Sequence, residues 1–219
     1  MSDIQTPLNI TPPLQTDTWI AASWDDYMQA IEDPIYASAK GYYYREHMRL
    51  EMLPVGHDHS EDDGTVSLAV NLFCIAKNIP LKVLPNCSYR KAGSKECQPD
   101  VSYYFGERAR IIPRGTSVID LSCYPAPDLV IEVAVTSLLD DLGTKRSLYE
   151  ELEVTEYWIV DAENTQILAY AVADQGSQRI QISRVLPGLD IAVVEAALRR
   201  SRETDQSQVG AWLLAQFQQ

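Results

Sequence analysis

The segment Pro127-Asp128-Leu129-Val130-Ile131-Glu132-Val133-Ala134-Val135 predicts the central strand of an α/β fold. From Leu129 onward it is apolar at every position except Glu132, which is typical of a central strand buried on both faces. An ionised carboxylate in such a strand destabilises the fold by several kcal/mol unless another group compensates it. We therefore expect Glu132 to bind a cation, unless it lies on a solvated face or pairs with a structural arginine.

A second acid stands at the beginning of a second predicted strand, which covers about residues 99–105. Because side chains alternate along a strand, Val101 and Phe105 point to one face and leave Asp100 on the other. If this strand lies beside residues 128–135, Asp100 and Glu132 face each other and can share one divalent cation. The alternative is structural, since aspartate after proline is a common way to begin a strand.

A lysine falls on the inward face of the helix that we expect at about residues 141–151. The stripe of this helix that should face the sheet consists of Leu142, Lys145, Tyr149 and Leu152. A lysine in such a stripe usually reaches a carboxylate, a phosphate or water at the edge of the sheet. The alternative is a lysine that merely extends its ammonium group to solvent past a buried stem.

The remaining pattern predicts one α/β domain, because 219 residues are long for one domain and short for two. Helices are expected at 23–33, 58–77, 191–200 and 207–218, and strands at 42–45, 48–53, 81–84, 156–160, 166–172 and 179–185. Ser23 is expected to cap the first helix, and Asp58 or Ser60 the second. This order of elements favours a central mixed β-sheet flanked by helices.

The chain divides into three expected regions and has the composition of a soluble protein. Residues 1–22 are expected to form an irregular N-terminal arm, residues 23–190 the α/β domain, and residues 191–219 a C-terminal helical extension packed on it. We find no signal peptide, and no apolar run approaches the ~18 residues of a membrane span. Four cysteines without a CxxC pair favour reduced thiols, so we expect a cytoplasmic location and no structural zinc.

The formal net charge is −13, with 18 lysine and arginine residues against 31 aspartate and glutamate residues. This balance counts against tight, sequence-independent coating of DNA, because phosphate binding normally requires a basic surface. It does not exclude a nuclease, since a local basic patch around an acidic metal site is sufficient.

Asp100, Glu132 and Lys145 together form the set of groups needed for metal-assisted hydrolysis of a phosphodiester. The carboxylates would hold Mg²⁺ or Mn²⁺, which lowers the pKa of a bound water and stabilises charge on the phosphate. The lysine would orient the attacking water, help to deprotonate it, or neutralise the phosphoryl group. Two other hypotheses stay open: a degenerate nuclease fold serving as a binding or assembly module, and a metal-dependent hydrolase of small phosphate esters.

A succession of segments resembles a known bacterial family: Gln98-Pro99-Asp100-Val101, then Pro127-Asp128-Leu129-Val130-Ile131-Glu132-Val133, then Lys145, and then Glu156-Tyr157-Trp158-Ile159-Val160-Asp161. The family consists of restriction-endonuclease-like proteins of the PD-(D/E)XK nuclease superfamily, and the resemblance runs from about Tyr42 to Leu189. It implies a restriction-endonuclease-like core and divalent-metal-dependent endonuclease chemistry on DNA.

On this resemblance, Asp100 matches the first acidic ligand of the metal and Glu132 the second. The lysine expected two residues after the glutamate is Ala134 here, so Lys145 would be a lysine that has migrated to the following helix. A homodimer is expected, because cutting two strands favours two sites.

Glu51 and His59 match positions that recur in the family. Glu51 is a candidate for holding the outer waters of the metal or a second metal, or it is a surface carboxylate. His59, together with His57 and Asp58, forms either a metal site or a helix-capping turn. Asp128 would be ~13 Å from Glu132 along the same strand, too far to share one metal, so we interpret it as a strand-start residue.

Overall fold

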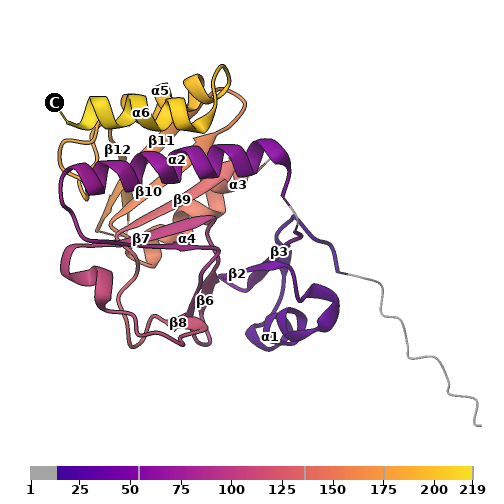
Figure 1. Ribbon diagram of the computed structural model, residues 1–219. Helices are drawn as coiled ribbons and strands as arrows, with labels where there is room; N and C mark the ends of the chain where they lie inside the picture. Colours follow the sequence, from indigo (N-terminus) through magenta and orange to yellow (C-terminus); the bar gives the residue numbers. More distant parts are fainter. Residues whose placement is uncertain (1–13, 54, 136, 175, 219) are drawn as a thin grey trace, which may run out of the picture.

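The computed structural model describes residues 14–53, 55–135, 137–174 and 176–218 (Figure 1). In these residues the strands form two six-stranded sheets. Residues 1–13 of the expected N-terminal arm and residue 219 of the expected extension lie outside the described residues. The division into arm, domain and extension therefore stays a prediction.

The central sheet contains both strands on which the sequence argument depends. Its strand order is β12-β11-β10-β9-β7-β4, with bounds Gly176–Arg179, Gln166–Ala173, Glu156–Asp161, Leu129–Ala134, Val101–Phe105 and Leu81–Pro85. β9 and β10 are parallel, whereas the other neighbouring pairs are antiparallel, so the sheet is mixed as predicted. Every residue of β9 is buried, which confirms the expectation of a strand covered on both faces.

Three helices cover one face of the central sheet (Figure 1): α2 (His57–Ala76), α5 (Ile191–Ser201) and α6 (Gln206–Phe217). Their bounds agree with the predicted ranges to within one residue at each end. Alternate residues of the central strands, such as Tyr103 in β7 and Ile131 in β9, pack with these helices in one apolar core. Because side chains alternate along a strand, Asp100 and Glu132 lie on the opposite face of the sheet from these helices.

The start of α2 differs from the prediction. Gly56 is the N-cap residue, and no side chain forms a capping hydrogen bond there, so the expected cap by Asp58 or Ser60 was wrong. The Asp58 carboxylate instead pairs with the His57 ring at 2.9 Å, and the Ser60 hydroxyl donates to the Gly56 carbonyl at 3.1 Å.

The opposite face of the central sheet packs against a broken helix and the second sheet. The helix consists of α3 (Leu138–Asp140), a π-helical turn (Asp141–Lys145) and α4 (Arg146–Glu151), where one regular helix was expected at 141–151. The second sheet has the order β1-β3-β2-β6-β5-β8, with bounds Ile20–Ala21, His47–Glu51, Lys40–Tyr44, Lys95–Cys97, Ser88–Lys91 and Val118–Asp120. Between the two sheets lies a core rich in tyrosine: Tyr42, Tyr44, Tyr89, Tyr104, Tyr149 and Tyr157.

The sequence predicted the β2–β3 hairpin but not the second sheet that contains it. α1 (Trp24–Glu32) packs on this sheet and begins as predicted, because Ser23 and Asp26 form a capping box. β5 and β6 form a local hairpin, whereas the β1–β3, β2–β6 and β5–β8 pairings join residues far apart in the sequence. Strands of two to five residues carry little local pattern, so their long-range pairing depends on the tertiary packing.

One predicted strand is wrong. A strand was expected at 179–185, but β12 ends at Arg179, and the residues that follow form a loop with an isolated bridge between Ile182 and Asp190. The reason is a buried acid, Glu156, which binds the backbone of this loop and so takes donors that a β-ladder would need.

Glu156 therefore anchors the loop to the central sheet. Its carboxylate accepts hydrogen bonds from the N–H groups of Arg184 at 2.8 Å and Val185 at 3.2 Å. The indole N–H of Trp158 donates to it at 2.6 Å, and the Ser183 hydroxyl at 3.2 Å. This acid thus acts as a structural group at the start of a strand whose next four residues, 157–160, are hydrophobic.

No helix in the described ranges is long and apolar enough to cross a membrane. The cysteines Cys74, Cys87, Cys97 and Cys123 are free thiols.

We expect Glu156→Ala to lower the free energy of unfolding by at least about 3 kcal/mol, because each donor left without an acceptor costs roughly 1–3 kcal/mol. Urea unfolding followed by circular dichroism measures this change. Glu163→Ala, in an exposed turn, is the matched control and should change stability by less than about 0.5 kcal/mol. Equal unfolding midpoints for the two variants would contradict the anchoring role.

Candidate active site

The structure brings Asp100 and Glu132 together on one face of the central sheet. β7 and β9 are antiparallel, with Val101 opposite Ile131, so the register continued by one residue places Asp100 opposite Glu132. The N–H of Val133 donates to the Asp100 carboxylate at 2.7 Å, which ties the start of β7 to β9. The two carboxylates therefore lie on the same side of the sheet, as the alternation of side chains predicted.

Glu132 is 2% exposed and is held by two tyrosines. The hydroxyl of Tyr149 donates to its Oε1 at 2.5 Å, and the hydroxyl of Tyr42 at 3.1 Å. Burial raises the pKa of Glu132 to about 8, and the negative charge of Asp100 adds to this effect, although the ammonium group of Lys145 opposes it. Glu132 therefore binds a proton or another cation more readily than an ordinary glutamate does.

Asp100 has the opposite electrostatic character. Its Oδ1 pairs with the ammonium group of Lys40, and the Nε2 atom of His59 lies 3.2 Å from its Oδ2. Burial opposes ionisation, but the hydrogen bond from His59 and the charge of Lys40 hold the pKa of Asp100 below its ordinary value. The site thus combines one firmly ionised carboxylate with one that prefers a proton.

Lys145 lies at the end of the π-helical turn and points inward, as the helical stripe predicted. Its side chain is 2% exposed, and its Nζ atom is 2.9 Å from Oε1 of Glu51, 3.1 Å from Oδ1 of Asp141 and 3.6 Å from Oε2 of Glu132. The ammonium group also lies 4.4 Å from the centre of the Tyr42 ring. The structure therefore places Lys145 beside Glu132 rather than in solvent.

The two second-rank residues also reach this site. Glu51, at the end of β3, contacts Lys145 and receives a hydrogen bond from Arg49 at 2.8 Å. His59, in the first turn of α2, contacts Asp100, whereas the neighbouring His57 is 84% exposed and points elsewhere. Asp128 lies apart, as predicted, where it binds the N–H of Phe105 at 2.8 Å.

Sequence reasoning missed three buried charged residues of this site: Lys40, Arg49 and Asp141. Lys40 begins β2, two residues before the predicted start of that strand. The predicted strand therefore left Lys40 outside the sheet. The signal that identified Glu132, a charge inside an apolar strand, is also present in Lys40-Gly41-Tyr42-Tyr43-Tyr44. Asp141 and Lys145 are four residues apart and form an ion pair within the turn.

A cavity of about 220 Å³ opens beside these residues. Its lining includes Lys40, Glu51, His59, Asp100 and Lys145. Glu132 is not part of the lining, although Lys145, which it contacts, is. A ligand in the cavity would therefore meet Asp100 directly, and would meet Glu132 only past the side chains of the lining.

The site contains more acids than permanently charged bases. Glu51, Asp100, Glu132 and Asp141 contact Lys40, Arg49 and Lys145, while His59 also contacts Asp100 and Glu132 retains a proton in the metal-free protein. Among the residues that the structure describes, no three acids, histidines or cysteines form a ready-made metal cage. The donor set that fits a divalent ion is the facing pair of Asp100 and Glu132, because Mg²⁺ commonly takes one or two carboxylates and keeps several waters.

We expect the metal-free protein to lose stability as the pH rises from about 5 to 8. The pKa of Glu132 rises on folding from 4.5 to about 8, so the unfolded chain releases a proton that the folded chain retains. The free energy of unfolding should fall by at most about 1.4 kcal/mol per pH unit in this window through Glu132 alone. Urea unfolding in EDTA at several pH values measures the slope.

The control for this measurement is Glu132→Gln, which keeps the acceptor for the tyrosines but cannot ionise. His59, whose pKa is raised by Asp100 against the effect of burial, contributes a slope of the same sign. The informative quantity is therefore the difference between wild type and Glu132→Gln. Identical slopes for the two proteins would show that Glu132 is ionised in the folded state throughout this range.

Comparison with known proteins bears on the family and the fold of the chain. The chain matches the model of the Uma2 family, described as "Putative restriction endonuclease", over residues 24–207. The crystal structure of "a putative nuclease belonging to DUF820" from Anabaena variabilis ATCC 29413 resembles it in fold, with a TM-score of 0.55 and 17% sequence identity. This match covers 80% of the present chain and 98% of that chain.

At that identity the structural match bears on the fold alone, and no curated protein matches the chain. The fold is nevertheless restriction-endonuclease-like, as the sequence predicted, with a mixed central sheet flanked by helices. Since the family model spans most of the sequence, the chain belongs to the Uma2 family of restriction-endonuclease-like proteins.

Proposed function

We propose that this protein is a divalent-metal-dependent endonuclease that hydrolyses phosphodiester bonds in DNA. The observation that carries the proposal is the facing pair of Asp100 and Glu132, with Lys145 buried against Glu132 beside an open cavity. Membership of a family described by its nuclease character supports the reaction class.

In this proposal, Asp100 and Glu132 hold Mg²⁺ or Mn²⁺. When bound, the metal supplies a water of lowered pKa and stabilises charge on the phosphate. The protein orients both carboxylates in advance, through the N–H of Val133 on Asp100 and the hydroxyl of Tyr149 on Glu132. Because these donors are fixed in β9 and on the buried face of α4, little reorganisation is needed when a cation enters.

Lys145 acts as a permanent cation and not as a base. Burial disfavours its charged form, but Glu132, Asp141 and Glu51 together raise the pKa of Lys145 well above its ordinary value. A lysine that keeps its proton stabilises negative charge on the phosphate. It replaces in this role the lysine that the family places where Ala134 stands.

The substrate reaches the carboxylates through the cavity of about 220 Å³, whose lining combines the cations Lys40, Arg49 and Lys145 with the acids Asp17, Glu51, Asp100 and Asp140. A divalent cation held there would add the positive charge that a phosphate requires in a chain of net charge −13. Glu51, which contacts Lys145 at this cavity, would hold the outer waters of a bound metal. A homodimer would present two such sites to the two strands of a duplex.

With Mn²⁺ the purified protein should nick supercoiled plasmid DNA, as measured by gel electrophoresis. Asp100→Asn and Glu132→Gln should each reduce the rate by at least about 100-fold, because each removes a charge that holds the metal. Glu163→Gln, in the exposed turn, is the matched control and should keep the wild-type rate. Activity that survives Glu132→Gln in a folded protein would remove Glu132 from the mechanism.

A chromogenic phosphodiester tested beside the plasmid distinguishes this proposal from hydrolysis of small phosphate esters. Turnover of the small ester without nicking of DNA would favour the second activity.

A binding or assembly module built on a degenerate nuclease fold is the second candidate function. The observation that favours it is that the oxygens of both carboxylates already have protein partners, Lys40 and His59 on Asp100 and two tyrosine hydroxyls on Glu132. A buried network in which each carboxylate has protein partners without a metal can serve only to stabilise the fold.

Calorimetric titration with Mn²⁺ separates the two candidates. For the endonuclease we expect a saturable heat of binding that disappears in Asp100→Asn. Wild-type protein without such a heat, while both carboxylates are intact, would favour the binding module.

A further inference from the structure

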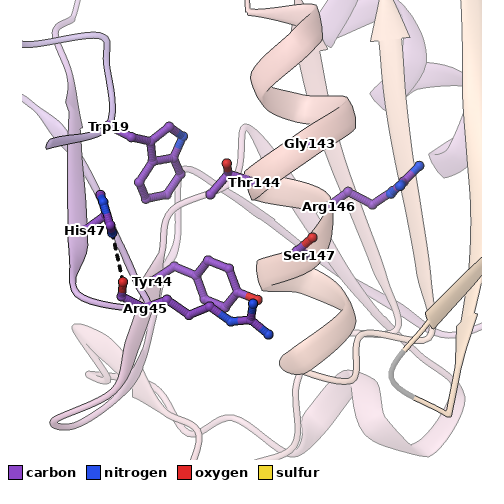
Figure 2. Close-up of a pocket in the computed structure, with 8 residues that line it drawn as sticks. All are labelled: Trp19, Tyr44, Arg45, His47, Gly143, Thr144, Arg146 and Ser147. Atoms are coloured by element: carbon purple, nitrogen blue, oxygen red, sulfur yellow. Dashed lines mark hydrogen bonds between the residues drawn. The ribbon is translucent and has the colours of Figure 1, made fainter. Parts of the chain in front are cut away.

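A second cavity lies outside the candidate active site (Figure 2). It has a volume of about 490 Å³ and is bounded by Trp19, by Tyr44, Arg45 and His47 of the β2–β3 hairpin, and by the helix that carries Lys145. Thr144 and Ser147 form the helical wall. A volume of this size is sufficient for one aromatic heterocycle with its sugar.

The charge of this cavity differs from that of the molecule as a whole. Its lining includes Arg45, Arg146 and His47 but no aspartate or glutamate. Three other cavities, including the candidate active site, each have acids in their lining. In a chain with 31 acids and 18 basic residues, a cavity without acids is suited to an anionic ligand.

Trp19 gives the cavity an aromatic wall. Figure 2 shows its indole ring opposite Thr144, with Arg45 and His47 on the hairpin side. The ring packs edge-on against Tyr42, with centroids 6.4 Å apart, so its position is fixed by the core between the sheets. Its indole N–H is enclosed but has no acceptor among the described residues.

The two arginines of the cavity differ in availability. The side chain of Arg45 is 73% exposed and pairs with Glu151 at 2.6 Å. Glu151 also accepts a hydrogen bond from Tyr44 and pairs with Lys95, so it keeps two partners when Arg45 turns to a phosphate. Arg146 extends away from Trp19 in Figure 2, and its guanidinium lies over the Tyr170 ring. Arg45 is therefore the cation that can contact a ligand stacked on Trp19.

The β2–β3 hairpin connects this cavity to the carboxylates. Tyr44 pairs with His47 at the cavity, and Lys40 pairs with Glu51 at the other end of the same two strands. Four residues of a strand span about 13 Å, which equals about four nucleotides at ~3.4 Å per stacked base. The strands of the hairpin are buried, so this length measures the separation of the two cavities at its ends, which a short strand of nucleic acid on the surface can span.

We propose that the Trp19 cavity binds an unpaired base of the substrate strand, so that single-stranded DNA is a better ligand of this protein than duplex DNA. The assignment rests on the proposed function for the identity of the polymer. Stacking on an aromatic ring needs an exposed base face, and a base inside a duplex has none to offer. Trp19 supplies the stacking surface, and Arg45 binds the adjacent phosphate.

The test is the binding of fluorescein-labelled oligothymidylate, followed by fluorescence anisotropy on the full chain in EDTA, where no metal-dependent cleavage takes place. Trp19→Ala should weaken binding by about 5- to 100-fold, the usual effect of removing one stacked base contact. Arg45→Ala should weaken it less and reduce the salt dependence of the affinity. Arg199→Ala, on the exposed side of α5, is the matched control and should bind as wild type does.

A second measurement covers the case in which Trp19→Ala does not fold. Oligothymidylate should quench the tryptophan fluorescence of the wild type, and Trp19→Phe, which keeps an aromatic ring, should lose most of that quenching while it retains part of the affinity. Parallel titrations use a duplex of the same length and oligouridylate. Tighter binding of oligouridylate than of oligothymidylate would make RNA the ligand and overturn the assignment to DNA.

Three results would overturn the proposal: no binding of single-stranded DNA, equal or tighter binding of the duplex, or quenching and affinity that do not depend on Trp19. These results are separate from the fate of the proposed function. Binding that depends on Trp19, in a protein that never cleaves DNA, would leave the cavity assignment intact and overturn the endonuclease proposal. Cleavage of DNA by the wild type, together with DNA binding that does not depend on Trp19, would support the endonuclease proposal and overturn the cavity assignment.

Discussion

The rest of the structure depends on the compensation of negative charge buried beside the central sheet. Glu132 lies in β9 among aliphatic residues, and its neighbours β7 and β10 exclude water from both sides. The fold surrounds its carboxylate with two tyrosine hydroxyls and the ammonium group of Lys145. Removal of one partner would leave the others buried and unpaired, so these groups stabilise the fold as a unit.

The compensating groups come from parts of the chain that are far apart in sequence. The β2–β3 hairpin provides Lys40, Arg49 and Glu51, and the first turn of α2 provides His59. Lys145 comes from the π-helical turn, a distortion of the kind often found at functional sites. The second sheet is therefore required for the site, because it brings the hairpin over the carboxylates of the central sheet.

Tyr42 connects the two regions that we assign to nucleic acid. Its hydroxyl binds Glu132, and its ring packs against Trp19 on the other side. The net charge of −13 describes the whole surface, whereas a phosphate responds to the few groups within a Debye length of about 8–10 Å. An acidic protein can therefore present a cavity without acids in its lining, provided that many of its acids lie elsewhere, as Asp62 does in its pair with Arg202.

The sequence by itself determined the central strands, the main helices and the two facing carboxylates, because each leaves a local signal. A charge within an apolar strand identified Glu132, alternation placed Asp100 on the same face, and the helical stripe turned Lys145 inward. Only the tertiary structure decided the second sheet, the burial of Lys40 and the loop that Glu156 holds in place of a strand at 179–185. The physical reason is that local periodicity fixes which face of an element is buried, whereas long-range pairing and packing fix what that face meets.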